Sequence, residues 1–120
     1  MGKLVTRSLD SPDETRLLED DMGKIQLVHT DSGGVGRATF QPGWVWSKHV
    51  QPIAGTDSCQ AAHLGYCISG RMHVVLDDGQ ETDVGPGDFT AIPAGHDAWV
   101  VGDEACVMID WEGFTDYAKR

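Results

Sequence analysis

Basic residues are scarce in this sequence: 9 Lys and Arg stand against 19 Asp and Glu, which gives 120 residues a formal net charge of −10. A surface of this charge repels phosphate backbones and anionic lipid headgroups, so we expect no nucleic-acid partner. No apolar run approaches the roughly 20 residues that a membrane-spanning helix needs, and we expect no membrane partner either.

Cysteine is also rare, and secretory features are missing. The three cysteines are an odd number and cannot all pair within one chain. The first residues, MGKLVTRSLDSPDE, lack the apolar core of a secretory signal. Both features predict a reduced, cytoplasmic protein.

Long helical patterns are absent, and short runs with a period of two take their place. The apolar runs are KIQLVHT (24–30), VGRATF (35–40), AAHLGYCIS (61–69), MHVVL (72–76), ETDV (81–84), DFTAI (88–92), AWVV (98–101) and ACVMIDW (105–111). Turn-forming residues, among them many of the 15 glycines, separate these runs. Strands of this number and spacing predict an all-β sandwich or barrel. Such a fold hides its sheet edges by closing on itself or by pairing with a second copy, and we expect a homodimer.

One local helix signal precedes the strands. Ser11 is a suitable N-cap, Pro12 suits the first helical position and Glu14 completes a capping box. The segment is short and rich in carboxylates, which leaves an irregular or extended arm as an equal alternative.

Two longer stretches carry a family resemblance. The sequence GPGDFTAIPAGHDAWVV (85–101) has a Gly-Asp turn, a strand, and then Ile-Pro-x-Gly before the next strand. The sequence TDSCQAAHLGYCISG (56–70) continues through RMHVVLDDG. With their flanks, about Gly43 to Trp111, they resemble the two motifs of the cupin superfamily, and more narrowly its small stand-alone bacterial members of unsettled activity.

The resemblance implies a jelly-roll barrel, the double-stranded β-helix of cupins. Residues 1–40 then form an N-terminal arm and the first strands, and residues 41–115 form the cupin core of a single domain. In metal-binding cupins the motifs supply three histidines and a glutamate. Anchoring the first motif on Gly70 places three of these positions at Asp57, Cys59 and His63. The histidine of the second motif, three residues after its glycine, falls on Ala98, so none of the four keeps the usual residue.

The replacements still include metal ligands. Asp57, Cys59 and His63 lie on one face if their segment is extended, and His96 stands two residues before Ala98. A set of Cys59, His63 and His96, completed by Asp57 or a water, suits zinc better than a hard ion that prefers oxygen. Zinc with an open position could polarise a carbonyl or activate water.

Each of these residues also has an interpretation without metal. An isolated cysteine such as Cys59 is usually a small buried hydrophobe. His63 would then hydrogen-bond inside a polar cavity, and His96 would cap its Gly-rich turn.

Aromatic residues and one further histidine are candidates for ligand binding. Trp44 and Trp46 point the same way if their segment is extended, and they would form a flat wall for an apolar ligand. Trp99 follows Ala98 near the expected mouth, and His49 precedes the first motif. Packing in the core or at a dimer interface is the alternative for Trp44 and Trp46. Outward packing is the alternative for Trp99, and an exposed loop is the alternative for His49.

The sequence therefore predicts a small-molecule-binding cupin that holds a divalent metal, zinc-like in preference, through a non-standard ligand set. The alternative is a metal-free module that senses a ligand without catalysis. A structural dimer with a filled barrel is the third possibility. Neither the ligand nor the presence of catalysis follows from the residues.

Overall fold

The computed structural model describes residues 2–114 and 117–119 of the chain. Its elements are β1 (Glu14–Leu17), the 3-10 turn η1 (Glu19–Asp21), β2 (Gly23–Thr30), β3 (Gly33–Phe40), α1 (Trp46–His49), α2 (Gln51–Ala54), β4 (His63–Ser69), β5 (Met72–Leu76), β6 (Glu81–Val84), β7 (Phe89–Ile92), β8 (His96–Val100) and β9 (Cys106–Glu112). The strands agree with the apolar runs of the sequence.

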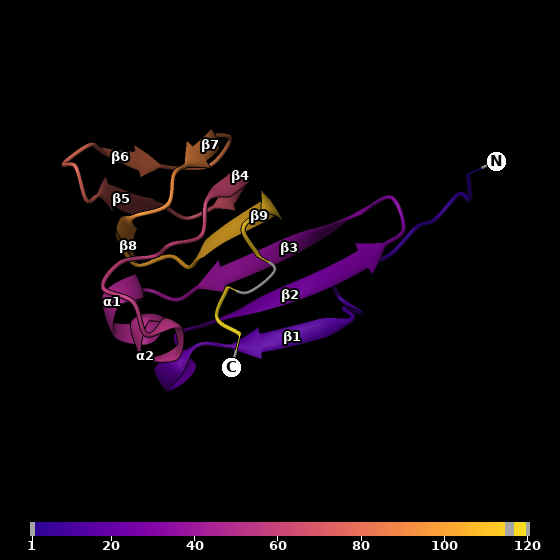
Figure 1. The fold of residues 1–120 in the computed structure, drawn as a ribbon, viewed down its shortest axis with the longest axis horizontal. Helices are drawn as coiled ribbons and strands as arrows, with labels where there is room; N and C mark the ends of the chain where they lie inside the picture. Colours follow the sequence, from indigo (N-terminus) through magenta and orange to yellow (C-terminus); the bar gives the residue numbers. More distant parts are fainter. Residues whose placement is uncertain (1, 115–116, 120) are drawn as a thin grey trace.

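Within the described ranges, the strands form two antiparallel sheets. The larger sheet has the order β1-β2-β3-β9-β4-β7, and the smaller has the order β6-β5-β8. Figure 1 shows the long strands β2 and β3 on one side and the short strands β5, β6 and β8 at the other end. The prediction of an all-β fold is confirmed.

The period of two in the sequence separates the inside from the outside of the barrel. In β4, Gly65 and Cys67 are buried, whereas Tyr66 and Ile68 are exposed. In β8, His96, Ala98 and Val100 are all buried. Successive side chains of a strand point to opposite faces, so the buried sets of both strands line the interior between the sheets.

The segment with the helix signal is a strand. Residues Glu14–Leu17 form β1, which pairs antiparallel with β2 from Glu14↔Leu27 to Leu17↔Lys24. The extended alternative is therefore the observed one, and the capping pattern at Ser11 does not begin a helix. Four residues with adjacent carboxylates gain little from a helix, while pairing with β2 satisfies their backbone groups.

Two short helices connect β3 to β4 and cover one end of the barrel. Trp46 begins α1, and α2 contains Pro52 in its first turn and is followed by Gly55, whose φ of 75° is left-handed. The segment considered extended for the two tryptophans is therefore helical from Trp46 onward, whereas Val45 before it is extended. None of the helices in the described ranges has the length and apolarity to cross a membrane.

Candidate metal centre

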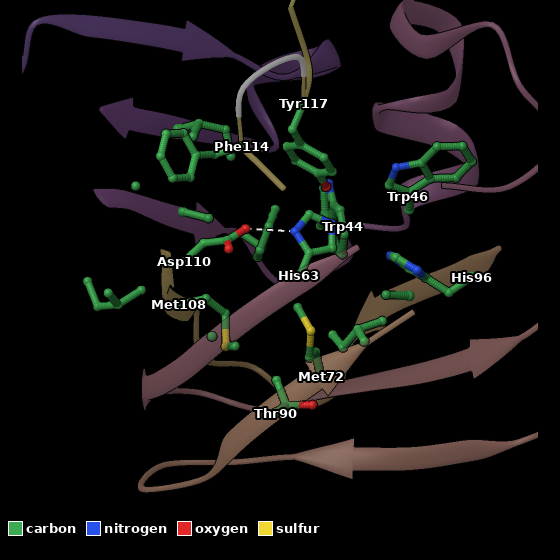
Figure 2. Close-up of a pocket in the computed structure, with 18 residues that line it drawn as sticks. Trp44, Trp46, His63, Met72, Thr90, His96, Met108, Asp110, Phe114 and Tyr117 are labelled. Atoms are coloured by element: carbon green, nitrogen blue, oxygen red, sulfur yellow. Dashed lines mark hydrogen bonds and ion pairs between the residues drawn. The ribbon is translucent and has the colours of Figure 1, made fainter. Parts of the chain in front are cut away.

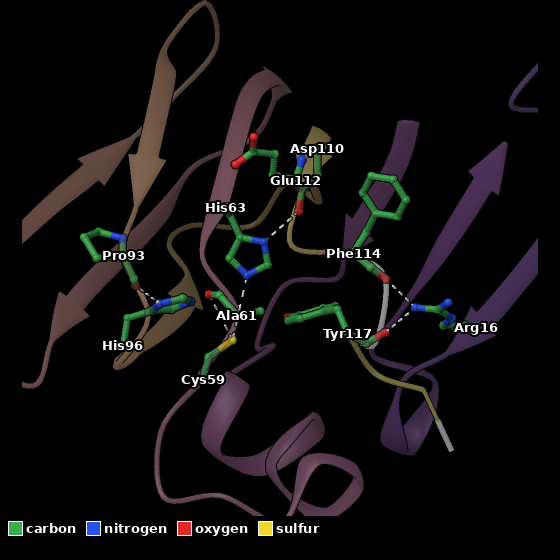
Figure 3. A network of polar contacts seen from close by, with 10 residues as sticks. All are labelled: Arg16, Cys59, Ala61, His63, Pro93, His96, Asp110, Glu112, Phe114 and Tyr117. Carbon is green, nitrogen blue, oxygen red and sulfur yellow. Dashed lines mark hydrogen bonds and ion pairs between the residues drawn. The ribbon is translucent and has the colours of Figure 1, made fainter. Parts of the chain in front are cut away.

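A cysteine and two histidines converge at the end of the barrel that α1 and α2 cover. The ligand atoms of Cys59, His63 and His96 all lie within 4.8 Å of one another. Cys59 and His96 are buried, and the His63 side chain is 13 % exposed. Figure 3 shows the three side chains pointing toward a common space between their backbones. This group could hold a metal ion.

Strand starts and one isolated bridge position the three residues. His63 is the first residue of β4 and His96 is the first of β8. Cys59 lies before β4, where its N–H donates to the His96 carbonyl at 2.7 Å in an isolated antiparallel bridge. The backbone of Cys59 is therefore tied directly to the strand that carries His96.

Both imidazoles are oriented through Nδ1. His63 Nδ1 lies 2.7 Å from Asp110 Oδ2 of β9, and His96 Nδ1 lies 2.7 Å from the Pro93 carbonyl oxygen. These oxygens accept, so each Nδ1 carries the proton and donates it. Nε2 of each ring then remains for the shared space, and Nε2 of His63 lies 3.8 Å from the Cys59 sulfur.

The pKa values of Cys59 and His63 favour a thiolate and an imidazolium. Burial raises the pKa of the Cys59 thiol, but hydrogen bonds from His63 and His96 outweigh burial and lower it from 9.0 to about 6. Burial lowers the pKa of His63, but its hydrogen bonds with Asp110 and Cys59 raise it from 6.5 to about 9. Cys59 and His63 thus form an ion pair near neutral pH, with Asp110 behind the imidazolium.

A mostly apolar cavity of about 60 Å³ adjoins the two histidines inside the barrel. Figure 2 shows Trp44, Trp46, His63 and His96 around one end of this cavity and Met72 and Met108 around the other. A second, more open groove of about 430 Å³ is lined in part by Cys59. Trp46 and Tyr117 line both spaces and so form part of the wall between them.

The end of the described chain covers His63. The Tyr117 ring packs edge-on against the His63 ring, with centroids 5.2 Å apart. Nη1 of the buried Arg16 side chain donates to the carbonyls of Phe114 and Tyr117 at 2.6 and 2.8 Å (Figure 3). Strand β1 therefore holds the end of the described chain, the tail with Phe114 and Tyr117, against the candidate centre.

Gly113 allows this close approach of the tail. Its φ of 88° is left-handed, and a Cβ atom at this position would collide with the Ala62 carbonyl and lie 2.7 Å from His63 Nδ1. Only glycine fits both the backbone conformation and the space beside the ring.

The structure brings some of the residues proposed from the sequence together and places the others elsewhere. Cys59, His63 and His96 come together, and Trp44 and Trp46 line the cavity beside them. Ala98, at the position of the second motif's histidine, also lines the cavity but offers no ligand atom.

Three proposed residues lie elsewhere. Asp57 is exposed and does not belong to the cluster of ligand atoms found in the described ranges. His49 is buried in α1, not in an exposed loop, and its Nδ1 accepts the Val45 N–H at 3.0 Å. Trp99 points away from the barrel interior and packs against His73, with ring centroids 5.0 Å apart. The structure therefore gives no support to these three as site residues.

Sequence reasoning missed Asp110, Arg16 and Tyr117. Asp110 has a signal in retrospect, because it is the one carboxylate within the apolar run ACVMIDW, and a carboxylate inside a strand needs a partner. Arg16 and Tyr117 have no such signal, since their contact joins opposite ends of the chain.

The donor set fits zinc on the chemistry of its atoms. Thiolate and imidazole are ligands that zinc prefers, and catalytic zinc sites keep three protein ligands and one open position. Ligating histidines usually donate their second ring N–H to a carboxylate or a backbone carbonyl, as His63 and His96 do here.

Comparison with known proteins identifies the family. The model of the cupin domain (Cupin_2) matches residues 36–112, more than half of the chain, and the chain therefore belongs to the cupin family. The fold and the family that the sequence motifs predicted are confirmed. No curated protein matches the chain.

Solved structures of other proteins share the fold. A protein of unknown function from Vibrio parahaemolyticus has a TM-score of 0.61 and 12% identity, covering 82% of this chain and 96% of that one. A sugar phosphate isomerase of the cupin superfamily from Silicibacter pomeroyi has a TM-score of 0.59 and 20% identity, covering 88% and 73%. KdgF from Halomonas sp. has a TM-score of 0.55 and 19% identity, covering 82% and 86%. At these identities the likeness shows the fold alone.

Proposed function

We propose that this cupin binds a small molecule beside a divalent metal of zinc-like preference, held by Cys59, His63 and His96. The observation that carries the proposal is the orientation of the two imidazoles. Asp110 and the Pro93 carbonyl each occupy an Nδ1, which leaves both Nε2 atoms and the Cys59 sulfur as a set of three donors. Such outer hydrogen bonds orient and strengthen metal ligands.

The ion would supply a Lewis acid at the wall of the cavity. Around it, Asp110 holds the His63 proton on Nδ1, and Tyr117 covers the His63 ring from the tail side. Trp44 and Trp46 give the ligand an apolar surface and keep bulk water out of the barrel. The open groove beside Cys59 offers the ion a route from the solvent.

Metal analysis of tag-free protein tests this proposal. We expect about one equivalent of zinc in protein purified without a histidine tag, and its loss in Cys59→Ala and in His63→Ala. Cys67→Ala is the matched control, because Cys67 is buried elsewhere in β4 and should leave the zinc content unchanged. Less than about 0.2 equivalents of any transition metal in the wild type would refute the metal site.

One observation favours the alternative of a metal-free sensing module. Cys59 and His63 already neutralise each other as an ion pair, so the thiolate has a counter-charge without a cation. In that case a ligand would raise the melting temperature of metal-free protein without being converted. Turnover of any screened substrate would exclude this alternative.

A further inference from the structure

Two buried hydrogen-bond donors in the cavity wall lack partners. Trp44 and Trp46 are each 1 % exposed, and neither indole Nε1 has a hydrogen-bond partner among the described residues. Leaving a buried donor unsatisfied costs the desolvation of that group, and folded proteins contain few such groups. A bound acceptor in this cavity would satisfy both donors.

The indole rings are fixed by packing, not by polar contacts. Trp44 stacks on Phe40 with ring centroids 4.0 Å apart, and Trp46 is buried between the cavity and the outer groove. Figure 2 shows the nitrogen of Trp46 on the edge of its ring that faces Tyr117 and His63. The Trp46 N–H is therefore held beside the candidate metal centre, and Trp44 lines the same cavity.

The polar groups of Asp110 and His96 beside the cavity have partners of their own. Asp110 accepts from His63, and His96 donates to the Pro93 carbonyl. The acceptor carboxylate of the cavity is thus already used, while the two indole donors are free. A ligand that completes this site must bring acceptor oxygens and no donor of its own for these positions.

We propose that the cavity binds a small aliphatic carboxylate whose oxygens accept hydrogen bonds from Nε1 of Trp44 and of Trp46. A carboxylate has two oxygens for the two donors, and bonds to a charged acceptor are stronger than bonds to a neutral one. The apolar body of the ligand packs against Met72 and Met108 at the other end of the cavity. The volume of about 60 Å³ restricts that body to a few carbon atoms.

This inference rests on the proposed ligand-binding role of the cavity, but it does not require the metal. A bound cation would attract the same anion, because its positive charge lies at the wall that the carboxylate faces. The two ideas therefore have separate tests.

The test uses the wild-type protein and isobutyrate as the probe. The four tryptophans give four indole N–H resonances in a ¹⁵N–¹H spectrum, which Trp→Phe variants assign. We expect isobutyrate to shift the resonances of Trp44 and Trp46 downfield and to leave Trp99 and Trp111 unchanged. Isobutylamine, which has a similar shape but a donor in place of the acceptor, should shift neither. Equal responses of all four indoles, or none, would overturn the proposal.

Affinity measurements on variants give a second readout. Trp44→Phe and Trp46→Phe keep an aromatic ring and remove the N–H, and each should weaken isobutyrate binding by about tenfold. Trp99→Phe is the matched control and should bind as the wild type does, because Trp99 packs against His73 outside the cavity. Unchanged affinity in both cavity variants would also overturn the proposal.

Zinc-loaded and chelated protein are titrated side by side. If the indoles of Trp44 and Trp46 respond to isobutyrate but the protein never retains added zinc, the metal site is wrong and the carboxylate site stands. If one equivalent of zinc is bound and the indoles never respond, the carboxylate inference fails alone.

Discussion

Cys59 and Cys106 are both buried cysteines of one barrel, with 3 % and 0 % of their surface exposed, yet their acidities differ widely. Burial and the nearby Cys67 raise the pKa of Cys106 to about 12. Burial acts on Cys59 in the same direction, but His63 and His96 lower its pKa to about 6.

The comparison shows that burial alone does not determine what a cysteine does. Without a cationic or donor neighbour, a buried thiol stays neutral and serves as a small apolar group. Beside two oriented imidazoles, the same side chain becomes a thiolate and a candidate ligand. One end of the barrel is therefore core, and the other is prepared for a cation.

The largest expected effect is in the thiolate titration of metal-free protein. We expect an absorbance band near 240 nm that grows as the pH rises through about 6, because Cys59 deprotonates there, whereas Cys106 stays protonated until about pH 12. Cys59→Ser should remove this step and Cys106→Ser should keep it. A wild-type step that begins only above pH 8.5 would contradict the assigned ion pair.

The free energy of unfolding should change little with pH while Cys59 and His63 titrate. A lowered thiol pKa stabilises the fold above pH 9.0, and this contribution is lost as the pH falls to about 6. A raised imidazole pKa stabilises below pH 6.5, and this contribution is lost as the pH rises to about 9. Between about 6.5 and 9 the two slopes cancel, since the folded and unfolded pairs bind the same number of protons.

The next effect is the loss of a ligand. Cys59→Ala should weaken zinc binding by more than about 100-fold, because removing a ligand costs more than removing the outer hydrogen bond of one. Competition with a chromogenic chelator measures the affinity. Cys67→Ala should stay within a factor of about two, and equal losses in the two variants would point to a folding defect.

A smaller loss is expected when Asp110 is changed. Asp110→Asn removes the charge behind His63 and should weaken zinc binding by about 10- to 100-fold. Glu112→Gln is the matched control, since it removes one carboxylate from an exposed position two residues further along β9. Zinc affinity reduced equally in both variants would show a general charge effect without an orienting role for Asp110.

The smallest effect concerns stability at the two cysteines. Cys106→Ser places a hydroxyl in the core and should lower the free energy of unfolding by about 1–3 kcal/mol. Cys59→Ser should cost less, because His63 and His96 can pair with the new hydroxyl. Denaturant unfolding of metal-free protein measures both, and a larger cost at Cys59 would reverse the comparison.

The sequence predicts the strands well because their pattern is local. The runs MHVVL and ETDV coincide with β5 and β6, and in β5 the buried Met72 and Val74 alternate with the half-buried His73 and Val75. The four-residue strand β1 was ambiguous, because its pairing with β2 depends on residues far away along the chain.

The three candidate ligands were chosen for a reason that holds only in part. Alternation along one strand was expected to align Cys59 with His63, but β4 begins at His63. Cys59 reaches the group through its bridge to His96, and Asp57, which alternation and the motif position both suggested, is exposed. Contacts between distant strands, such as that of His63 with Asp110, are set by register that no single sequence reveals.

The hydrogen bonds from Arg16 to the carbonyls of Phe114 and Tyr117 have a practical consequence for truncated forms of this protein. A fragment cut to the family boundaries, residues 36–112, would lack both Arg16 and Tyr117. It would keep every candidate ligand, yet the His63 ring would lose its aromatic cover, and the barrel would lose β1 and β2. Measurements on this fragment would therefore describe a site that is more open to solvent than the site in the 120-residue chain.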